Sequence, residues 1–264
     1  MTGGRLLSAL YLLAITVFLL SPLVIVAIVA FTSASFVSFP PPGYSTRWIV
    51  KVLQDGEFMR SLWNSVLVGA AAIGVSLSLG VPAAVALAGN QSRAARILTT
   101  WLMAPLSIPS LILALGLLFF LSTIGLGNTF TGLLMGHGLI TFPYLLRTVL
   151  SVMIGLPRSH VEAAYCLGAT PLAAFFRVVL PSLAPGLVAG SLFAFLISFD
   201  EVAVSLLLTN ASTVTLPVTI LNYLVHNYDP AVAAISLVKM VVVFVVLVIV
   251  ERAFGLDRVI LPKA

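Results

Sequence analysis

Hydrophobic residues run in long, nearly uninterrupted stretches along most of the chain, and most charged residues stand between these stretches. A helix needs about 20 apolar residues to cross the roughly 30 Å hydrocarbon core of a bilayer. The stretches that meet this length are Leu6–Phe31, Leu62–Ala88, Leu98–Leu121, Leu133–Leu156, Pro185–Leu208 and Pro230–Val250. Because lipid cannot satisfy exposed backbone N–H and C=O groups, each stretch is expected to be helical. The pattern therefore predicts an all-α membrane protein with six transmembrane helices, forming a single transmembrane domain over residues 1–264.

Basic residues indicate which side of the membrane each connection occupies. With a cytoplasmic amino terminus, the inner side carries Arg5, Arg93, Arg96, Arg158, Arg177, Arg252, Arg258 and Lys263. The outer side carries only Arg47, Lys51 and Arg60. The positive-inside rule therefore predicts that both termini are cytoplasmic, that loop 32–61 is extracytoplasmic and that loop 157–184 is cytoplasmic. Arg147, near the inner end of the fourth helix, is expected to extend toward the headgroups.

The first apolar stretch has two interpretations, a retained helix or a cleaved signal peptide. Its apolar core is longer than the 7–15 residues typical of a signal peptide, which favours the retained helix.

Composition narrows the class of protein. Of the 264 residues, 61% are hydrophobic and 8% are charged, against about 45–50% and about 25% in typical globular chains. So few charges cannot cover a water-facing surface, which excludes a soluble enzyme, a disordered protein and a nucleic-acid-binding domain. The single cysteine, Cys166, cannot form an internal disulfide and is expected to pack within a loop helix. The three histidines are far apart without a carboxylate-rich cluster, so no metal site is predicted.

Loop 157–184 carries the signals of a short helix. Ser159 and Glu162 have the spacing of a capping box, in which the serine hydroxyl accepts from the Glu162 amide and the carboxylate reaches back. Gly168 tolerates the left-handed backbone that often ends a helix. A helix that begins at Ser159 and ends before Gly168 is therefore predicted.

A second short helix is predicted after Gly168. Thr170 and Pro171 suit the N-cap and the first helical position, and Pro181 is expected to stop the helix. The apolar side chains of the two helices would be costly in water. We expect them to pack on the membrane domain, to dock on a partner, or to lie on the lipid surface as an amphipathic segment.

The residues of this loop resemble the EAA loop of ABC importer permeases. Glu162-Ala163-Ala164, three residues, Gly168, nine residues, Val178 and then Leu180-Pro181 match the family's pattern, which usually has isoleucine where Val178 stands. The resemblance implies a pair of coupling helices that inserts into a cleft of a cytoplasmic ATPase subunit. The coupling residues it implies are Glu162, Ala163, Ala164, Gly168, Leu180 and Pro181. Glu162 and Gly168 would shape the loop, and the two alanines would allow close approach.

Further segments resemble the type I, binding-protein-dependent permeases of the spermidine/putrescine (PotC/PotI-like) family. They are Gly43-Tyr44-Ser45-Thr46-Arg47-Trp48, Asn64-Ser65, Ser198-Phe199-Asp200-Glu201, Leu206-Leu207-Leu208-Thr209 and Thr215-Leu216-Pro217-Val218. The resemblance implies a multi-pass permease subunit of a bacterial inner-membrane importer for a small polar metabolite, foremost a polyamine such as spermidine or putrescine. An opine, a phosphonate or an amino-acid-like solute is the alternative. The partners it implies are a second homologous permease subunit, two ATP-binding subunits, an extracytoplasmic solute-binding protein and membrane lipid.

The chain itself is not predicted to be an enzyme. It lacks the Gly-x-x-x-x-Gly-Lys-Ser/Thr loop that cradles phosphates, so ATP and Mg²⁺ are expected on the partner ATPase and no cofactor on this chain. One alternative is an ion-coupled secondary transporter, which would need internal repeats and interrupted helices. Another is an intramembrane hydrolase, which would need a nucleophile and a base on facing helices. His137 is the only histidine in a predicted span, and no partner for it is evident.

Three charged residues are predicted to lie deep in the membrane. Asp200 lies about 22 Å above the inner end of the fifth helix, with Glu201 beside it, and Lys239 lies near the middle of the sixth. Such charges face a water-filled path or a partner charge. Either Lys239 neutralises one acid and the cluster is structural, or one acid faces the substrate pathway and favours a cation. Neighbouring helical residues point about 100° apart, so both acids cannot face one small site.

Overall fold

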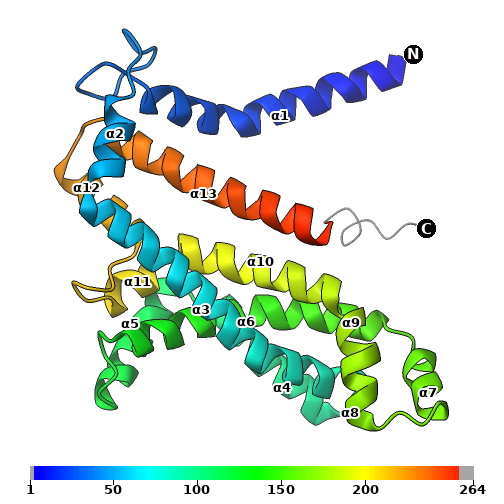
Figure 1. Ribbon diagram of the computed structural model, residues 1–264. Helices are drawn as coiled ribbons and strands as arrows, with labels where there is room; N and C mark the ends of the chain where they lie inside the picture. The colour runs from blue at the N-terminus through cyan, green and yellow to red at the C-terminus, as the bar shows by residue number, and fades with distance from the viewer. Residues whose placement is uncertain (1–2, 256–264) are drawn as a thin grey trace. The chain divides into compact units, whose positions relative to one another are not determined.

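The computed structural model describes residues 3–255, and helices dominate them (Figure 1). The helices are α1 (Gly3–Ala30), α2 (Arg47–Gln54), α3 (Gly56–Leu87), α4 (Arg93–Met103), α5 (Ser110–Thr123), α6 (Phe130–Gly155), α7 (Arg158–Cys166), α8 (Pro171–Ala174), α9 (Leu180–Ser182), α10 (Ala184–Asp200), α11 (Ala203–Leu208), α12 (Leu216–His226) and α13 (Ala231–Phe254). Over these residues the β structure is limited to an isolated bridge between Thr32 and Tyr44. The all-α prediction is confirmed. Arg258 and Lys263, which the charge pattern assigns to the inner side, lie outside the described residues.

Four helices, α1, α3, α6 and α13, are each long and apolar enough to cross a membrane. Two bent pairs also qualify: Arg93–Ser107 with Ser110–Thr123, bent by 105°, and Pro171–Ser182 with Ala184–Asp200, bent by 64°. Counting each pair as one span gives six spans, the predicted number, although the second pair begins in loop 157–184 and ends at Asp200. The predicted third span is broken between α4 and α5, and the predicted fifth span is broken after Asp200, so the expectation that each is one unbroken helix is wrong.

Prolines account for the break in the third span. After α4 the chain makes a 3-10 turn, Ala104–Ser107, and then becomes extended at Ile108, with ψ of 128°. Pro109 is also extended, with ψ of 129°, and precedes the first residue of α5. The proline ring disfavours helical backbone in the residue before it. An apolar run that contains Ile108-Pro109 therefore divides into two helices.

Contacts divide the described residues into two compact units. One contains the chain up to Arg60 together with Thr219–Phe244, and the other contains Ser61–Val218 and the chain from Val245 on. The loop that resembles the EAA loop belongs entirely to the second unit, and so do α6 and α10.

Helices α6 and α10 form the centre of the second unit, where they pack side by side. Their contact is part of a core that includes Leu145, Leu146, Val149 and Leu183, all fully buried. Small residues permit the close approach, since a Cβ at Gly190 of α10 would lie 3.2 Å from the Cα of Leu145. The fourth and fifth spans are thereby joined through backbone-level contact.

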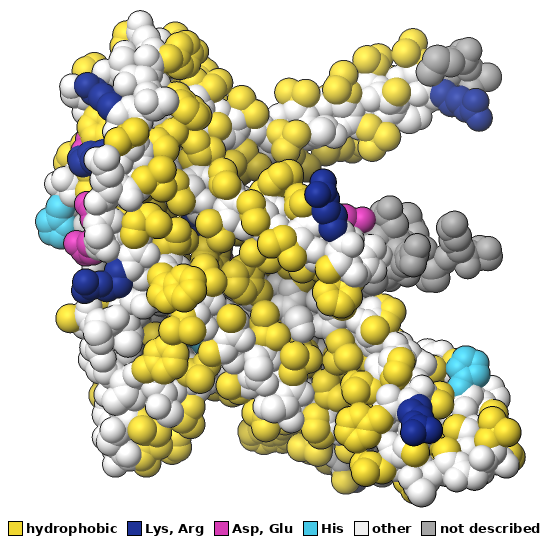
Figure 2. All heavy atoms as spheres, in the orientation of Figure 1, with side chains coloured by type: hydrophobic (Ala, Val, Ile, Leu, Met, Phe, Trp, Pro, Cys, Tyr) yellow, Lys and Arg dark blue, Asp and Glu magenta, His cyan; other side chains and the backbone are white. Residues whose placement is uncertain are grey.

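Apolar side chains face outward along the spans. Leu7 and Phe18 of α1 are 71% and 76% exposed, and Phe244 of α13 is 66% exposed. Figure 2 shows hydrophobic side chains over much of the visible face, with Lys and Arg confined to a few places. Exposed apolar area on this scale marks surface that meets lipid or another protein.

Candidate functional site

The loop between α6 and α10 folds as two helical segments joined by a glycine turn. Helix α7 is followed by Gly168, whose φ of +82° is left-handed. Helix α8 then begins after Thr170, whose hydroxyl accepts a hydrogen bond from the Ala173 amide at 3.3 Å. The glycine turn and the threonine cap are confirmed. The turn depends on the left-handed backbone of Gly168 and the cap depends on the Thr170 hydroxyl. Both act within a few residues, which is why the sequence alone predicts them.

Two local predictions for this loop are wrong. Ser159 does not cap α7, because the helix begins at Arg158 with Pro157 at the N-cap and without a side-chain cap. Pro181 does not stop the second segment: α8 continues through a π-helical turn, Phe175–Val179, into α9. The π-helical turn lies directly before Pro181, and the helical segment continues past this residue although it has no N–H. The chain bends only beyond it, between α9 and α10.

The loop carries an exposed apolar surface, which we call the coupling surface, made of Tyr165, Leu167, Leu172 and Phe176. Leu167 is 89% exposed, Leu172 69% and Phe176 56%. Cys166, predicted to be packed within its helix, is exposed at the edge of this surface. Cys166 is the last residue of α7. An exposed apolar surface of this kind marks a place that meets lipid or another protein.

The residues matched to the EAA pattern divide between the two faces of the loop. Glu162, Ala163, Gly168 and Pro181 are exposed, Leu180 is half-buried, and Ala164 is buried. No heavy atom lies within 4 Å of the Cβ position of Gly168, so its backbone angle and not crowding requires glycine.

The opposite face of the loop packs against the hydrophobic core of the protein. Val161 of α7 and Phe175 pack against the cluster that contains Val149 and Leu183. Ala174 and Val179 are buried as well, at 2% and 6% exposed. Because the interior of a protein is densely packed, displacement of the loop displaces the core helices that it contacts.

The acidic pair predicted deep in the fifth span lies at a break in the helix. Helix α10 ends at Asp200, and Glu201 is extended, with ψ of 121°. The Glu201 carboxylate accepts a hydrogen bond from the Val204 amide at 3.1 Å, in the first turn of α11. The prediction that the two acids project about 100° apart from one helix is therefore wrong. Glu201 satisfies a backbone N–H that the new helix leaves without a carbonyl partner.

A buried polar cluster spans the same break. His137 of α6 is fully buried, its Nδ1 lies 2.7 Å from the hydroxyl oxygen of Ser198, and its Nε2 lies 3.1 Å from that of Ser205. Ser198 belongs to α10 and Ser205 to α11, so one imidazole ties both sides of the break to α6. The sequence did not predict this cluster. The available signal was a pair of serines that flank the two acids in an apolar run, together with the only histidine in a predicted span.

The His137 cluster contains a Ser–His pair, which an intramembrane hydrolase would need. Ser198 and Ser205 are, however, only 4% and 0% exposed. Each hydroxyl is already engaged with the imidazole. The cluster is therefore suited to holding helices together and not to receiving a substrate.

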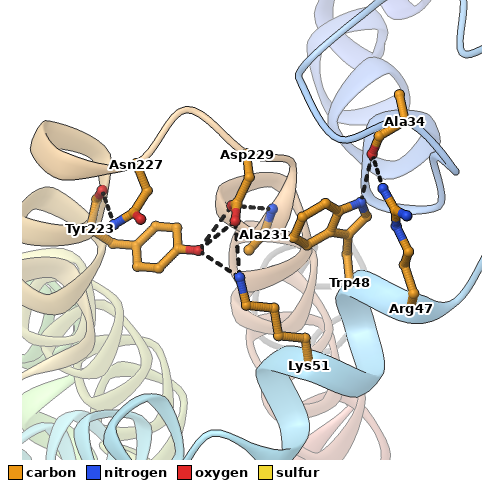
Figure 3. A network of polar contacts seen from close by, with 8 residues as sticks. All are labelled: Ala34, Arg47, Trp48, Lys51, Tyr223, Asn227, Asp229 and Ala231. Atoms are coloured by element: carbon orange, nitrogen blue, oxygen red, sulfur yellow. Dashed lines mark hydrogen bonds and ion pairs between the residues drawn. The ribbon is translucent and has the colours of Figure 1, made fainter.

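A second polar network lies in the first unit, in loop 32–61 and the segment after α12 (Figure 3). Lys51 Nζ contacts Asp229 at 2.9 Å and the Tyr223 hydroxyl at 3.1 Å. Asp229 also accepts from the Ala231 amide at 3.1 Å, at the start of α13. The hydrogen bond to Asp229 raises the pKa of Lys51 above 10.5, and burial raises the pKa of Tyr223 above 10.0. The network fixes α2 to the start of α13.

Trp48 extends this network along α2. Its indole N–H donates to the Ala34 carbonyl at 3.1 Å, and Arg47 donates to the same carbonyl at 2.5 Å. The Arg47 guanidinium and the Lys51 ammonium lie 4.8 and 4.9 Å from the centroid of the Trp48 rings, as cation–π contacts. Arg47 and Lys51 thus order loop 32–61 itself.

Comparison with known proteins identifies the family of this chain. Residues 76–253 match the family described as binding-protein-dependent transport system inner membrane component. The spermidine/putrescine transport system permease protein PotC of Escherichia coli strain K12 is 26% identical over 255 residues, covering 97% of this chain and 96% of PotC. The putrescine transport system permease protein PotI of the same strain is 30% identical over 228 residues, covering 83% of this chain and 80% of PotI.

Solved structures show the same fold. A chain of a bacterial ABC transporter involved in the import of the acidic polysaccharide alginate superposes with a TM-score of 0.74 at 19% identity, covering 95% of this chain and 96% of that one. A chain of the MetNI methionine ABC transporter, in an inward-facing conformation, gives 0.64 at 19% identity, covering 76% and 95%. The resemblance to ABC importer permeases is confirmed, and the chain belongs to the family of binding-protein-dependent transport system inner membrane components.

Proposed function

We propose that this chain is one of two permease subunits of an ATP-driven importer, and that its coupling surface docks on a separate ATPase. The observation that carries the proposal is the two-sided loop, with Leu167 and Leu172 exposed on one face and Val161 and Phe175 packed on the membrane core on the other. A partner that moves the exposed face therefore moves α6 and α10. Glu162, Ala163, Ala164, Gly168, Leu180 and Pro181 are the residues proposed to shape this contact.

The other components of the proposed transporter and its transport cycle follow from this assignment. ATP and Mg²⁺ bind the ATPase subunits, and this chain holds no cofactor. ATP-driven closure of the ATPases swings the spans from inward-open to outward-open, an extracytoplasmic binding protein releases solute into the cavity, and hydrolysis resets the permease. Both termini and loop 157–184 are cytoplasmic, as the distribution of Lys and Arg indicates.

Two classes of solute are candidates. A polyamine such as spermidine or putrescine is supported by the names of the PotC and PotI relatives and by the acids Asp200 and Glu201 at the break after α10. A carboxylate- or phosphonate-bearing solute, such as an opine, a phosphonate or an amino acid, is favoured by Arg147, an exposed cation in α6. Uptake by Asp200→Asn and Glu201→Gln variants separates the two: unchanged uptake in both variants removes the polyamine candidate.

The docking of the loop is tested with the native cysteine. Cys166 is the single cysteine of the chain and is exposed beside the coupling surface. In the assembled transporter, a thiol-directed crosslinker is expected to join Cys166 to the ATPase subunit. A Cys166→Ser variant with a cysteine introduced at Ser35, in loop 32–61, is the matched control and is expected to give no such product. Crosslinking from position 35 and not from Cys166 would reverse the topology and refute the proposal.

The energetic contribution of the coupling surface is tested separately. Leu167→Ser and Leu172→Ser together are expected to uncouple ATP hydrolysis from uptake, because they remove the apolar area that a partner would bury. Leu167→Met with Leu172→Met keeps that area and serves as the control. Normal coupling in the serine variant would contradict the assignment.

A further inference from the structure

A groove between α6 and α10 has an unusual lining for a membrane-spanning face. It encloses about 590 Å³ and is lined by Tyr144, Arg147, Thr148 and Ser151 of α6 and, across from them, by Gly186 and Ala189 of α10. The four residues of α6 follow at spacings of three, one and three, which places them on one side of the helix. Polar groups thus gather on one face of a helix whose other residues are mostly apolar.

Arg147 is the charged member of this face. It is exposed, and among residues 3–255 it forms no ion pair. It lies about 12 Å, or eight helical residues, from the end of α6 at Gly155. A charged side chain at such a position extends toward the headgroups, or faces a water-filled path or an opposite charge. The groove beside Arg147 supplies the space for a water-filled path.

The remaining polar groups suit an anionic oxygen group. Arginine presents a planar fork of N–H donors that fits a carboxylate or phosphonate in a bidentate manner. Ser151, one helical turn away and exposed, adds a hydroxyl donor. The Thr148 hydroxyl is engaged with the Tyr144 carbonyl at 2.7 Å, so it serves the helix and leaves Arg147, Ser151 and the Tyr144 hydroxyl as donors.

The size and composition of the groove also fit a small solute. Ligand sites in proteins typically measure about 300–1,000 Å³ and combine mostly apolar walls with a few convergent polar groups. A neighbouring groove of about 400 Å³ provides a contrast, since its lining includes Ile73, Ser191 and Val246 but no charged residue. That groove has the character of a surface that meets lipid tails.

We propose that the groove between α6 and α10 is a section of the solute path in which Arg147 binds an anionic oxygen group, carboxylate or phosphonate, of the transported solute. The inference rests on the proposed permease function and deepens it by naming the class of solute. It favours the carboxylate- and phosphonate-bearing candidates over a polyamine, because the one charge in the groove would repel a polycation.

The test measures the charge preference of a cysteine in the groove. Ser151→Cys is introduced with Cys166→Ser, and the assembled transporter is placed in nanodiscs of phosphatidylcholine. Reaction rates are compared for a sulfonate-bearing and a trimethylammonium-bearing methanethiosulfonate. The anionic reagent is expected to react faster, and Arg147→Gln is expected to lower its advantage by about tenfold. Arg147→Lys retains the charge and is expected to restore part of it.

Ser191→Cys in the neighbouring groove is the matched control and is expected to react slowly, without preference for charge. Equal rates at position 151, or a preference unaffected by Arg147→Gln, would overturn the proposal. Lack of reaction with both reagents would mean that the second permease chain covers this face, which also overturns it. If adding phosphatidylglycerol slows the reaction only while Arg147 is present, a lipid headgroup occupies the site and the proposal fails.

The two proposals fail separately. The crosslink from Cys166 to the ATPase reports on the coupling loop whatever the charge preference in the groove. Loss of that crosslink refutes the importer assignment, whereas loss of the charge preference refutes only the anion site.

Discussion

His137 Nδ1 lies 2.7 Å from the hydroxyl oxygen of Ser198, and this contact joins the first third of α6 to the last turn of α10. The other ring nitrogen contacts Ser205 of α11 at 3.1 Å. The imidazole is therefore the common partner of two helices separated by a break in the chain.

His137→Ala is expected to lower the stability of the protein because it leaves two buried hydroxyls without their partner. Each such group costs about 1–3 kcal/mol, toward the lower end where a serine hydroxyl can turn to the carbonyl of the preceding turn. The measurement is thermal unfolding in detergent. His137→Leu combined with Ser198→Ala and Ser205→Ala removes all three polar groups and is expected to lie closer to the wild type. A His137→Ala variant as stable as the wild type would contradict this role.

Gly190→Ala is expected to destabilise the contact between α6 and α10 by about 1–3 kcal/mol, since the added methyl would lie 3.2 Å from the Cα of Leu145. Backbone cannot move aside as a flexible side chain can. Gly116→Ala in α5 is the matched control, because nothing lies within 4 Å of its Cβ position. The control is expected to be neutral or stabilising by up to about 1 kcal/mol. Equal unfolding temperatures for the two variants would rule out the close approach.

Glu201→Ala is expected to destabilise α11 by about 1 kcal/mol, the usual cost of losing a side-chain cap. The carboxylate accepts from the Val204 amide at 3.1 Å, and alanine provides no acceptor. Glu201→Gln keeps an oxygen at the same position and is expected to retain most of the stability. Hydrogen exchange at the amides of 203–205 reads out the effect directly. Faster exchange in the glutamine variant than in the alanine variant would be inconsistent with capping.

The Lys51–Asp229 pair is expected to make stability fall at alkaline pH. The hydrogen bond to Asp229 raises the folded-state pKa of Lys51 above 10.5. The contribution of the Lys51–Asp229 pair to the free energy of unfolding is therefore complete below pH 10.5. It is lost as the pH rises through the higher pKa of Lys51 in the folded state. Because Lys51 is about half exposed, the contribution is expected to be at most about 1 kcal/mol and to weaken with salt.

The measurement for this pair is the difference in unfolding temperature between the wild type and Lys51→Met as a function of pH. Titrating groups that do not contact Lys51 cancel in that difference, whereas the contribution of Tyr223, which contacts Lys51, does not. The difference is expected to shrink above pH 10.5. A difference in unfolding temperature that grows at alkaline pH would contradict the predicted loss of the Lys51–Asp229 contribution.

Much of the fold follows from apolar length and local turn chemistry. Six runs of about 20 apolar residues are sufficient for the span count. Gly168 and Thr170 mark their turn because the left-handed glycine backbone and the threonine hydroxyl both act locally. Breaks inside apolar runs are harder to predict. Ile108-Pro109 carries a local signal for a break, but counting apolar residues does not detect it. The sequence around Asp200-Glu201 is compatible with a continuous helix, and only the structure shows that Glu201 caps the next helix.

The contacts that depend on facing helices could not be predicted. His137 and Ser198 are 61 residues apart, and their meeting depends on the register between α6 and α10, which apolar patterning does not specify. The exposure of Cys166 likewise depends on which side of α7 the core occupies. The groove at Arg147 belongs to the same class, because it exists only where two helices run together.

The 64° bend between α9 and α10 falls at Leu183, which is fully buried in the core. Under the proposed function, a force applied at Leu172 would act on α10 across this bend. Because α10 packs along α6 and its last turn contacts His137 of α6, the force would tilt the two helices together as one lever.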